Sequence, residues 1–442
     1  MTVPEKAPSR EIFGWAMFDF ANQAYTTLII TVVFGVMFTR VIVGDEPDFR
    51  TGNLLWSISL CLSYALVAAL APITVAIMDH SGVRKKFLFI SWMITILATA
   101  GLYWITPGLI IQGMLLIIIS NTAYSLGESF IASYLPLLGP PRILGRISGL
   151  GWALGYMGGL LATGLVLLGL GEISLDNFEN LRLTGPIAAL FFLLGALPTF
   201  AWLRQDRPAG LGRSAAALIK KGLTATLLTA AQVRHYRDLS LFLMALFFAM
   251  AGLYIVISFT FIYGDQIIGW DPEYQMLMFV FTQISAAAGA VLFGILQDRI
   301  GAGRTFNLTL LLWIICITLI YFTRDLTSLL NHNLGTSLEP QQLFLLVGCL
   351  AGSGLGSVQS CARTMVGMFT PKHKTSEFFG FWTMTLKLAA MTGILGLGIL
   401  QNFIGLEASV LLCILFFSVS LLISLAVNEQ NGLFAAGNLP QP

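Results

Sequence analysis

Charged residues are scarce in this chain of 442 residues, and their scarcity argues against a soluble fold. Asp, Glu, Lys and Arg make up 10% of the sequence, whereas hydrophobic residues make up 56%. A soluble domain usually carries about 25% charged residues. A soluble fold of this length cannot bury so much apolar surface, so lipid must cover it. The net charge of +2 and the scattered basic residues give no reason to expect a nucleic-acid partner.

Cysteine and histidine are also sparse. The five cysteines lie inside apolar segments without CxxC or Cys/His metal spacing, which is typical of small buried side chains. The four histidines fall at or beyond predicted helix ends and form no ligand cluster. The sequence lacks a Gly-x-x-x-x-Gly-Lys phosphate loop, so ATP is not expected to drive the protein directly. We therefore expect no metal, no cofactor and no enzymatic activity.

Long apolar segments are what the sequence has instead. A segment crosses the hydrocarbon core with about 20 mostly apolar residues. Twelve segments meet this requirement: 13–39, 53–78, 87–105, 109–138, 146–170, 184–203, 238–263, 273–297, 304–323, 341–369, 378–403 and 406–427. The polar start of the chain lacks the pattern of a cleaved signal peptide, so we expect the first span to be retained. The sequence predicts an all-α integral membrane protein of twelve transmembrane helices.

A short polar turn occurs twice, about half a chain length apart, each time at the end of an apolar run. The first copy contains Asp79, Gly82 and Arg84, and the second contains Asp298, Arg299, Gly301 and Arg304. A duplicated helix–turn–helix unit in a very apolar chain indicates two similar halves, an arrangement that suits alternating access. We predict two pseudo-symmetric six-helix bundles, 1–203 and 238–442. The basic linker between them, 204–237, is predicted to be an interfacial helix, with a solvated connector as the alternative.

The distribution of lysine and arginine predicts the orientation. With both termini in the cytoplasm, eighteen basic residues fall inside and four, Arg40, Arg50, Arg182 and Arg324, fall outside. Because short cytoplasmic loops carry the excess of basic residues, this bias favours cytoplasmic termini. Both polar turns would then face the cytoplasm. We expect a multi-pass, monomeric protein of a bacterial inner (plasma) membrane, with the lipid bilayer, a small solute and protons as its partners.

The number of spans, the two halves and the repeated turn resemble the major facilitator superfamily. Residues 294–304 match its Gly-x-x-x-Asp-Arg-x-Gly-x-x-Arg/Lys signature, and the first copy is weaker, with Val75 and His80 at two signature positions. Residues 14–25, 145–159, 359–363 and 377–380, together with Lys387, resemble the vacuole-effluxer-like branch, also called the unknown major facilitator family. The resemblance implies the major facilitator fold. Fungal members are linked to export of amino acids from the vacuole.

Four charged residues inside the predicted spans are the first candidates for a transport site, because a charge at membrane depth is costly unless it is paired or faces water. They are Asp19, Glu128, Arg363 and Lys387. Neighbouring polar and aromatic candidates for substrate or proton binding are Asn22, Tyr25, Asn121, Trp152, Tyr156 and Gln359. Each of the ten could instead be structural, as a helix–helix contact, a packing residue or a charge at a helix end. The turn residues Asp79, Gly82, Arg84, Asp298, Arg299, Gly301 and Arg304 are gating candidates.

These residues favour a secondary active transporter for a small polar or zwitterionic solute, such as an amino acid or a peptide. Asp19 or Glu128 would exchange protons and meet an ammonium group, while Lys387 or Arg363 would hold a carboxylate. Two alternatives remain open at this point. One is an exporter of a lipid-like or amphipathic compound, and the other is a membrane scaffold or sensor that keeps the fold without transporting.

Overall fold

The computed structural model describes residues 6–44, 49–81, 83–171, 177–204, 224, 236–371 and 374–438. Within these ranges every regular element is a helix. Eleven of the helical segments are long and apolar enough to cross a membrane. A twelfth candidate pairs α17 (Leu411–Ser424) with α18 (Glu429–Ala435) across a bend of 66°. The prediction of an all-helical membrane protein is confirmed.

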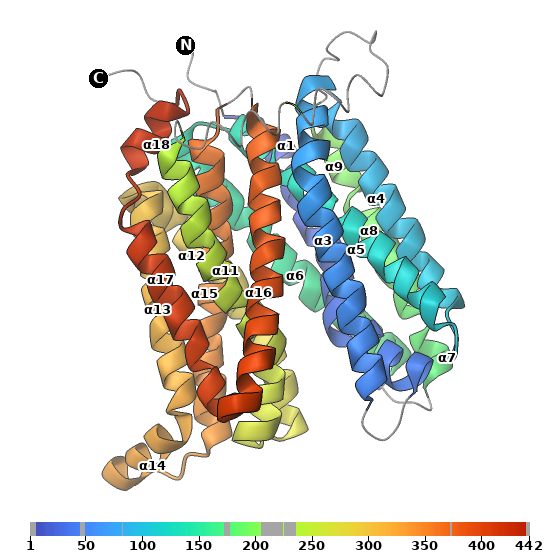
Figure 1. Cartoon of the computed structure of the whole chain (residues 1–442), viewed down its shortest axis with the longest axis vertical. Coiled ribbons are helices and arrows are strands. Elements are labelled where there is room, and N and C mark those ends of the chain that lie inside the picture. Colours follow the sequence, from blue (N-terminus) through green and yellow to red (C-terminus); the bar gives the residue numbers. More distant parts are fainter. Residues whose placement is uncertain are drawn as a thin grey trace. The chain divides into compact units, whose positions relative to one another are not determined.

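The helices form two compact units. The first comprises Met1–Pro140, Leu154–Ala230 and Lys372–Met384. Its helices are α1 (Ser9–Ala24), η1 (Tyr25–Val32), α2 (Phe34–Met37), η2 (Phe38–Val43), α3 (Arg50–Ser81), α4 (Arg84–Gly101), η3 (Leu102–Trp104), α5 (Ile110–Ala132), η4 (Leu135–Leu137), most of α6 (Leu144–Leu170), α7 (Phe178–Leu181), α8 (Thr184–Gly195) and α9 (Leu197–Trp202) (Figure 1). Helix α5 packs along both α3 and α4, and α8 packs along α1 and α4.

The second unit comprises Pro141–Ala153, Ala231–Pro371 and Thr385–Pro442. Its elements are η5 (Pro141–Ile143), α11 (Arg237–Tyr263), η6 (Gly264–Ile268), α12 (Pro272–Ile300), α13 (Ala302–Tyr321), α14 (Thr323–Leu334), α15 (Pro340–Phe369), most of α16 (Thr375–Ser409), α17 and α18. Helix α12 packs along α15, and α17 packs along α11 and α13. Figure 1 shows α14 and α18 at opposite ends of this unit.

Two helices are divided between the units. Helix α6 belongs to the second unit up to Ala153 and to the first from Leu154, whereas α16 begins in the first unit and continues in the second from Thr385. The compact units are therefore not simply the two halves of the sequence. Of the linker 204–237, only Arg204, Thr224, Tyr236 and Arg237 are among the described residues. The boundaries 1–203 and 238–442 and the interfacial linker helix stay predictions.

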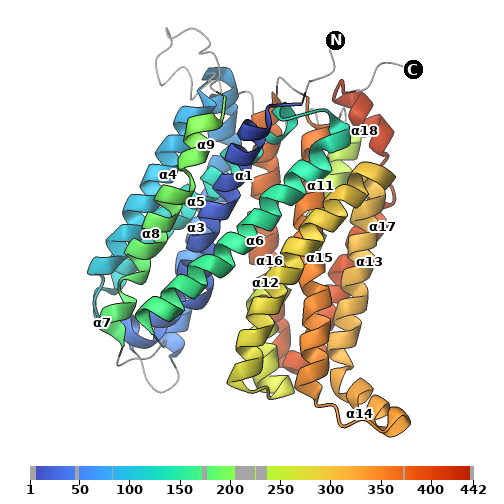
Figure 2. The same cartoon turned by 180° about the vertical axis from the view of Figure 1, so that it is seen from behind.

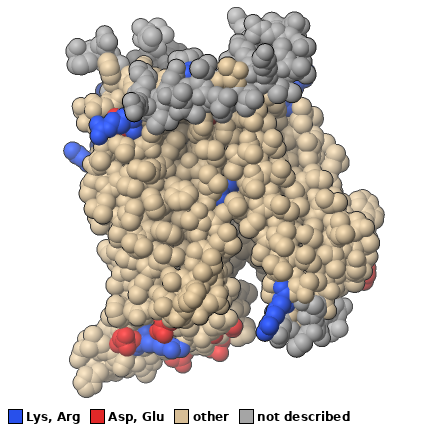
Figure 3. All heavy atoms as spheres, viewed as in Figure 1, with Lys and Arg blue, Asp and Glu red and all other residues tan. Residues whose placement is uncertain are grey.

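The long apolar sequences form helices because a helix satisfies its own backbone hydrogen bonds, which lipid cannot do. Charged side chains gather toward the ends of the helices on the face seen in Figure 3, and the band between them is almost free of charge. Helix α15 also begins at a reciprocal cap, in which Glu339 and Gln342 exchange side-chain and backbone hydrogen bonds. These features match helices that cross an apolar layer and end in polar surroundings.

The first span departs from regular geometry beside the candidate residues. After α1 the chain continues as the π-helix η1, which begins at Tyr25. π-helical turns are rare and occur frequently at functional sites. Helix α1 itself begins at Ser9, four residues before the predicted start at 13. Asp19 therefore lies ten residues into the helix, or about 15 Å at 1.5 Å per residue, which is deeper than the sequence suggested.

Candidate functional site

A half-buried carboxylate lies at the centre of a hydrogen-bonded group in the first unit. The Tyr124 hydroxyl donates to Glu128 Oε1 at 2.9 Å, and the Thr26 hydroxyl donates to the Tyr124 oxygen at 2.7 Å. The Tyr25 ring stacks on that of Tyr124 with centroids 4.8 Å apart, and its hydroxyl shares a 2.8 Å hydrogen bond with Ser120. We call Tyr25, Thr26, Ser120, Tyr124 and Glu128 the Glu128 cluster. It joins the first span to α5.

The spacing along α5 explains why these side chains meet. Ser120, Tyr124 and Glu128 follow one another at intervals of four residues, so they share one face of the helix. Glu128 lies nine residues before Leu137, where its span ends, so it is about 13 Å from that end. Tyr25 and Glu128 both contact Tyr124, and Asp19 is buried on α1. That these candidates bind a substrate or a proton stays a prediction.

The other candidates of the first unit have separate places. Asn22 is buried on α1, one turn beyond Asp19, and Tyr156 is buried on α6. Asn121 donates its amide to the Ser63 hydroxyl and so ties α5 to α3. That contact favours the helix–helix interpretation of Asn121. Thr26 and Ser120 belong to the cluster but escaped the sequence analysis, because threonine and serine in a span usually bond their own helix.

A second polar group lies in the second unit, at the beginning of α6. Arg363 of α15 donates from Nε to the Ser148 hydroxyl at 3.1 Å and from Nη2 to the Ser148 carbonyl at 2.9 Å. Its guanidinium lies over the Trp152 ring, 5.3 Å from the centroid. The Ser148 hydroxyl in turn donates to the Ser360 carbonyl at 3.0 Å. We call Ser148, Trp152, Ser360 and Arg363 the Arg363 cluster. It joins α6 to α15.

Lys387 and Gln359 complete the candidates of the second unit. Lys387 is buried, with 7% of its surface exposed, and lies twelve residues into α16, about 18 Å from the start of that helix. Gln359 is half-buried one turn before Arg363 on α15. The acidic candidates thus belong to the first unit and the basic ones to the second. That they form one site stays a prediction.

The second polar turn is built around Asp298, whose side chain is 3% exposed. Its carboxylate accepts from Arg146 Nε at 2.7 Å and from the backbone N–H groups of Gly145 and Arg146 at 3.0 and 3.3 Å. Gly301 follows with φ of 98°, a conformation that side chains other than glycine rarely adopt. Asp298 therefore ties α12 to the beginning of α6. Figure 2 shows these two helices, α6 and α12. The sequence did not predict Arg146 as its partner.

The other turn candidates that the structure describes lie at the ends of α3, α4, α12 and α13. Arg299 and Arg304 are exposed at the α12–α13 turn, and Arg84 is buried at the start of α4. Asp79 lies in the last turn of α3. Gly82 lies outside the described residues. The gating roles of these residues stay predictions.

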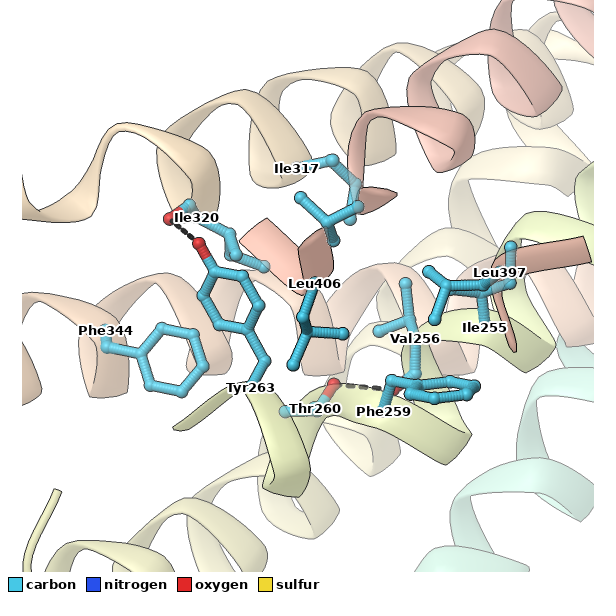
Figure 4. A pocket seen from close by; sticks show the side chains of 11 residues that line it. Ile255, Val256, Phe259, Thr260, Tyr263, Ile317, Ile320, Phe344, Leu397 and Leu406 are labelled. Carbon is cyan, nitrogen blue, oxygen red and sulfur yellow. Dashed lines mark hydrogen bonds between the residues drawn. The ribbon is translucent and has the colours of Figure 1, made fainter. Parts of the chain in front are cut away.

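The second unit also contains an apolar cavity (Figure 4). Its free space is only about 20 Å³, enough for about one water molecule, and it is lined by Ile255, Val256, Phe259, Thr260, Tyr263, Ile317, Ile320, Phe344, Leu397, Leu406 and Val410. The Thr260 hydroxyl donates to the Val256 carbonyl at 2.6 Å, and that of Tyr263 to the Ile320 carbonyl at 3.4 Å. Because both hydroxyls are bonded to backbone, the lining suits an apolar group and not a polar solute.

The sequence of the chain matches one protein family over most of its length. A profile of proteins described as "Vacuole effluxer Atg22 like" matches residues 55–437. The chain belongs to this family. The vacuole-effluxer-like chain is similar to the uncharacterized MFS-type transporter YxiO of Bacillus subtilis, with 23% identity over 94% of each chain. It is 23% identical to Autophagy-related protein 22 of Yarrowia lipolytica over 64% of its own length and half of the fungal protein.

Solved structures show the same fold. The human organic anion transporter MFSD10 matches with a TM-score of 0.70 and 16% identity, over 94% of this chain and 100% of that one. The proton:xylose symporter XylE matches with a TM-score of 0.70 and 14% identity, over 96% and 97% of the two chains. The fold is that of the major facilitator superfamily, and the vacuole-effluxer-like protein is an MFS-type transporter. The predicted branch and fold class are confirmed.

Proposed function

We propose that the protein is a proton-coupled secondary transporter of a small zwitterionic solute, an amino acid or a short peptide, and that it works by alternating access. The observation that carries the proposal is the half-buried Glu128 carboxylate, which accepts a hydrogen bond from Tyr124 about 13 Å from the end of its span, while Thr26 in turn donates to Tyr124. A carboxylate at that depth is costly, so it is a functional candidate by default. The family to which the chain belongs consists of proteins described as effluxer-like.

Glu128 is suited both to a proton and to an ammonium group. A protonated Glu128 carries no charge and crosses between states at low electrostatic cost, whereas its carboxylate attracts a cation. The aromatic rings of Tyr25 and Tyr124 beside it add faces on which a cation binds favourably. Asp19, buried in the same unit, is the second acidic candidate. Proton exchange at these carboxyls would link solute movement to a proton gradient.

Lys387 would supply the opposite charge. It is buried twelve residues into α16, and a charged side chain at such depth is a functional candidate. Its positive charge is opposite to that of a substrate carboxylate. A zwitterion that carries both charges then matches the signs of Glu128 and Lys387. The export of amino acids implied by the family resemblance agrees with this substrate class.

Transport by the purified protein in liposomes tests the proposal. We expect an imposed pH gradient to drive accumulation of labelled amino acids or dipeptides. Glu128→Gln should abolish the response to the gradient and keep some exchange, and Lys387→Ala should weaken substrate binding. Glu273→Gln, which alters an exposed carboxylate at the start of α12, is the matched control. If each of the three single variants, Glu128→Gln, Asp19→Asn and Lys387→Ala, transports solute as the wild type does, this site is rejected.

Export of an amphipathic compound is the second candidate function. The observation that favours it is the apolar lining of the cavity in the second unit, which carries no charged side chain (Figure 4). On this alternative, labelled lysolipids or apolar dyes would be transported and compete with one another. Hydrophilic amino acids would neither be transported nor compete.

A further inference from the structure

The Arg363 cluster holds the beginning of α6 against the second unit, although α6 lies in the first half of the sequence. Its residues up to Ala153 group with α12 and α15, and those from Leu154 group with the first unit. In alternating access the two six-helix halves of such a transporter move against each other. The start of α6 must then separate from α12 and α15 in one of the two states.

Close helix packing makes this contact possible. A Cβ on Gly149 would lie 2.3 Å from the Ala290 carbonyl of α12, and one on Gly356 of α15 would lie 2.0 Å from the Ala286 carbonyl. Glycine at both positions therefore lets α6 and α15 approach α12 closely. Ser148, next to Gly149, consequently comes within hydrogen-bond distance of α15.

Arg363 supplies the polar part of the contact. It is 3% exposed, and its two hydrogen bonds to Ser148 use the hydroxyl and the backbone carbonyl of the same residue. Hydrogen bonds from a charged donor are about twice as strong as neutral ones. The guanidinium also covers the Trp152 ring, one turn further along α6. Arg363 thus contacts two successive turns of α6, at Ser148 and at Trp152, within the segment that belongs to the second unit.

We infer that Arg363 is a positioning residue for the conformational cycle, which keeps the first ten residues of α6 (144–153) docked on α15 in the state seen here and releases them in the opposite state. This inference rests on the proposed alternating-access function, but it assigns Arg363 to Ser148 and Trp152 in place of a substrate carboxylate. Arg363 then sets the balance between the two states and is not a ligand of the solute.

Hydrogen–deuterium exchange of the full-length protein tests the inference without any substrate. In Arg363→Gln we expect peptides covering residues 141–153 to exchange about tenfold faster, since hydrogen bonds to charged groups contribute about this factor or more. Peptides covering residues 154–170 of the same helix should be unchanged. Ser148→Ala keeps the carbonyl bond and should give a smaller, about threefold, increase. Arg237→Gln, which alters an exposed arginine at the start of α11, is the control.

Each result of the exchange experiment either supports or overturns the role inferred for Arg363. Faster exchange confined to residues 141–153 supports the inference. Unchanged exchange in both Arg363→Gln and Ser148→Ala overturns it, and so does an equal increase in all helices, which would indicate a general structural role. If Arg363→Gln does not fold, Arg363→Lys and Ser148→Ala give the same comparison. A failure of the transport assay alongside the expected exchange pattern would count against the proposed substrate and not against Arg363.

Discussion

Gly149 of α6 lies so close to Ala290 of α12 that a Cβ on the glycine would stand 2.3 Å from the alanine carbonyl oxygen. A backbone carbonyl in a helix cannot move aside as a flexible side chain can. The contact therefore requires glycine for its spacing, and the glycine's neighbour Ser148 carries the hydrogen bonds to α15.

Gly149→Ala should separate α6 from α12 and destabilise the protein. Overpacking of this kind costs about 1–3 kcal/mol. We expect a lower thermal unfolding temperature in detergent. Gly164→Ala on the same helix is a matched control, because nothing lies within 4 Å of its added Cβ and alanine favours the helix. Equal unfolding temperatures for the two variants would show that the helices accommodate the methyl group without loss.

Gly380 of α16 makes a similarly close helix contact in the other unit. A Cβ on Gly380 would lie 2.3 Å from Val75 Cγ2 and 2.8 Å from Pro72 Cα of α3. Gly380→Ala should therefore cost about 1–3 kcal/mol as well. Its control is Gly398→Ala, again with nothing within 4 Å. A melting temperature of Gly380→Ala that matches this control would remove the parallel between the two glycines.

The sequence predicted the all-helical fold, because this depends on composition along single segments, and the same segments show where the rare charged residues lie. Apolar runs of about 20 residues define the spans, and a charge such as Glu128 stands out within them. The partners of these charges could not be predicted in the same way. Thr26 and Ser148 are common residues in helices, and their contacts depend on which helices pack together. Arg363 was predicted as a substrate ligand because its sequence context gives its depth but not its neighbour.

The cap of α13 illustrates the same limit. The residue before this helix is Gly301, which has no side chain to cap the first turn. Glu429 of α18 does so instead, by accepting from the Gly303 N–H at 3.0 Å. Helix α18 is held in turn by Asn438, whose amide donates to the Met368 carbonyl at 2.8 Å. A residue 126 positions away in the chain completes the helix start, so no local pattern reveals it.

Glu429→Ala should therefore destabilise the second unit. A lost helix cap costs about 1 kcal/mol, and a carboxylate near a helix start contributes through the helix dipole as well. We expect a lower unfolding temperature and faster deuterium exchange at the start of α13. Glu429→Gln keeps an oxygen acceptor and should recover part of the loss. Gln430→Ala alters the exposed neighbour and should have no effect. An effect of Gln430→Ala as large as that of Glu429→Ala would assign the change to α18 as a whole.

Tyr124→Phe tests the hydrogen-bonded path in the Glu128 cluster. The substitution keeps the ring that stacks on Tyr25 but removes the hydroxyl that donates to Glu128 and accepts from Thr26. A hydrogen bond to a charged group contributes about 1.5–3 kcal/mol, so accumulation driven by a pH gradient should fall about tenfold or more. Exchange of solute at equal pH should fall less, because that mode needs no net proton movement.

The control for this prediction is Tyr274→Phe, which removes a half-buried hydroxyl near the start of α12 in the other unit. Thr26→Val extends the test, since it removes the donor to Tyr124 while nearly keeping the side-chain volume. We expect Thr26→Val to weaken gradient-driven accumulation in the same direction as Tyr124→Phe, but less. If both variants respond to the gradient as the parent protein does, the hydroxyl chain has no part in proton coupling, and Glu128 would have to exchange its proton by another route.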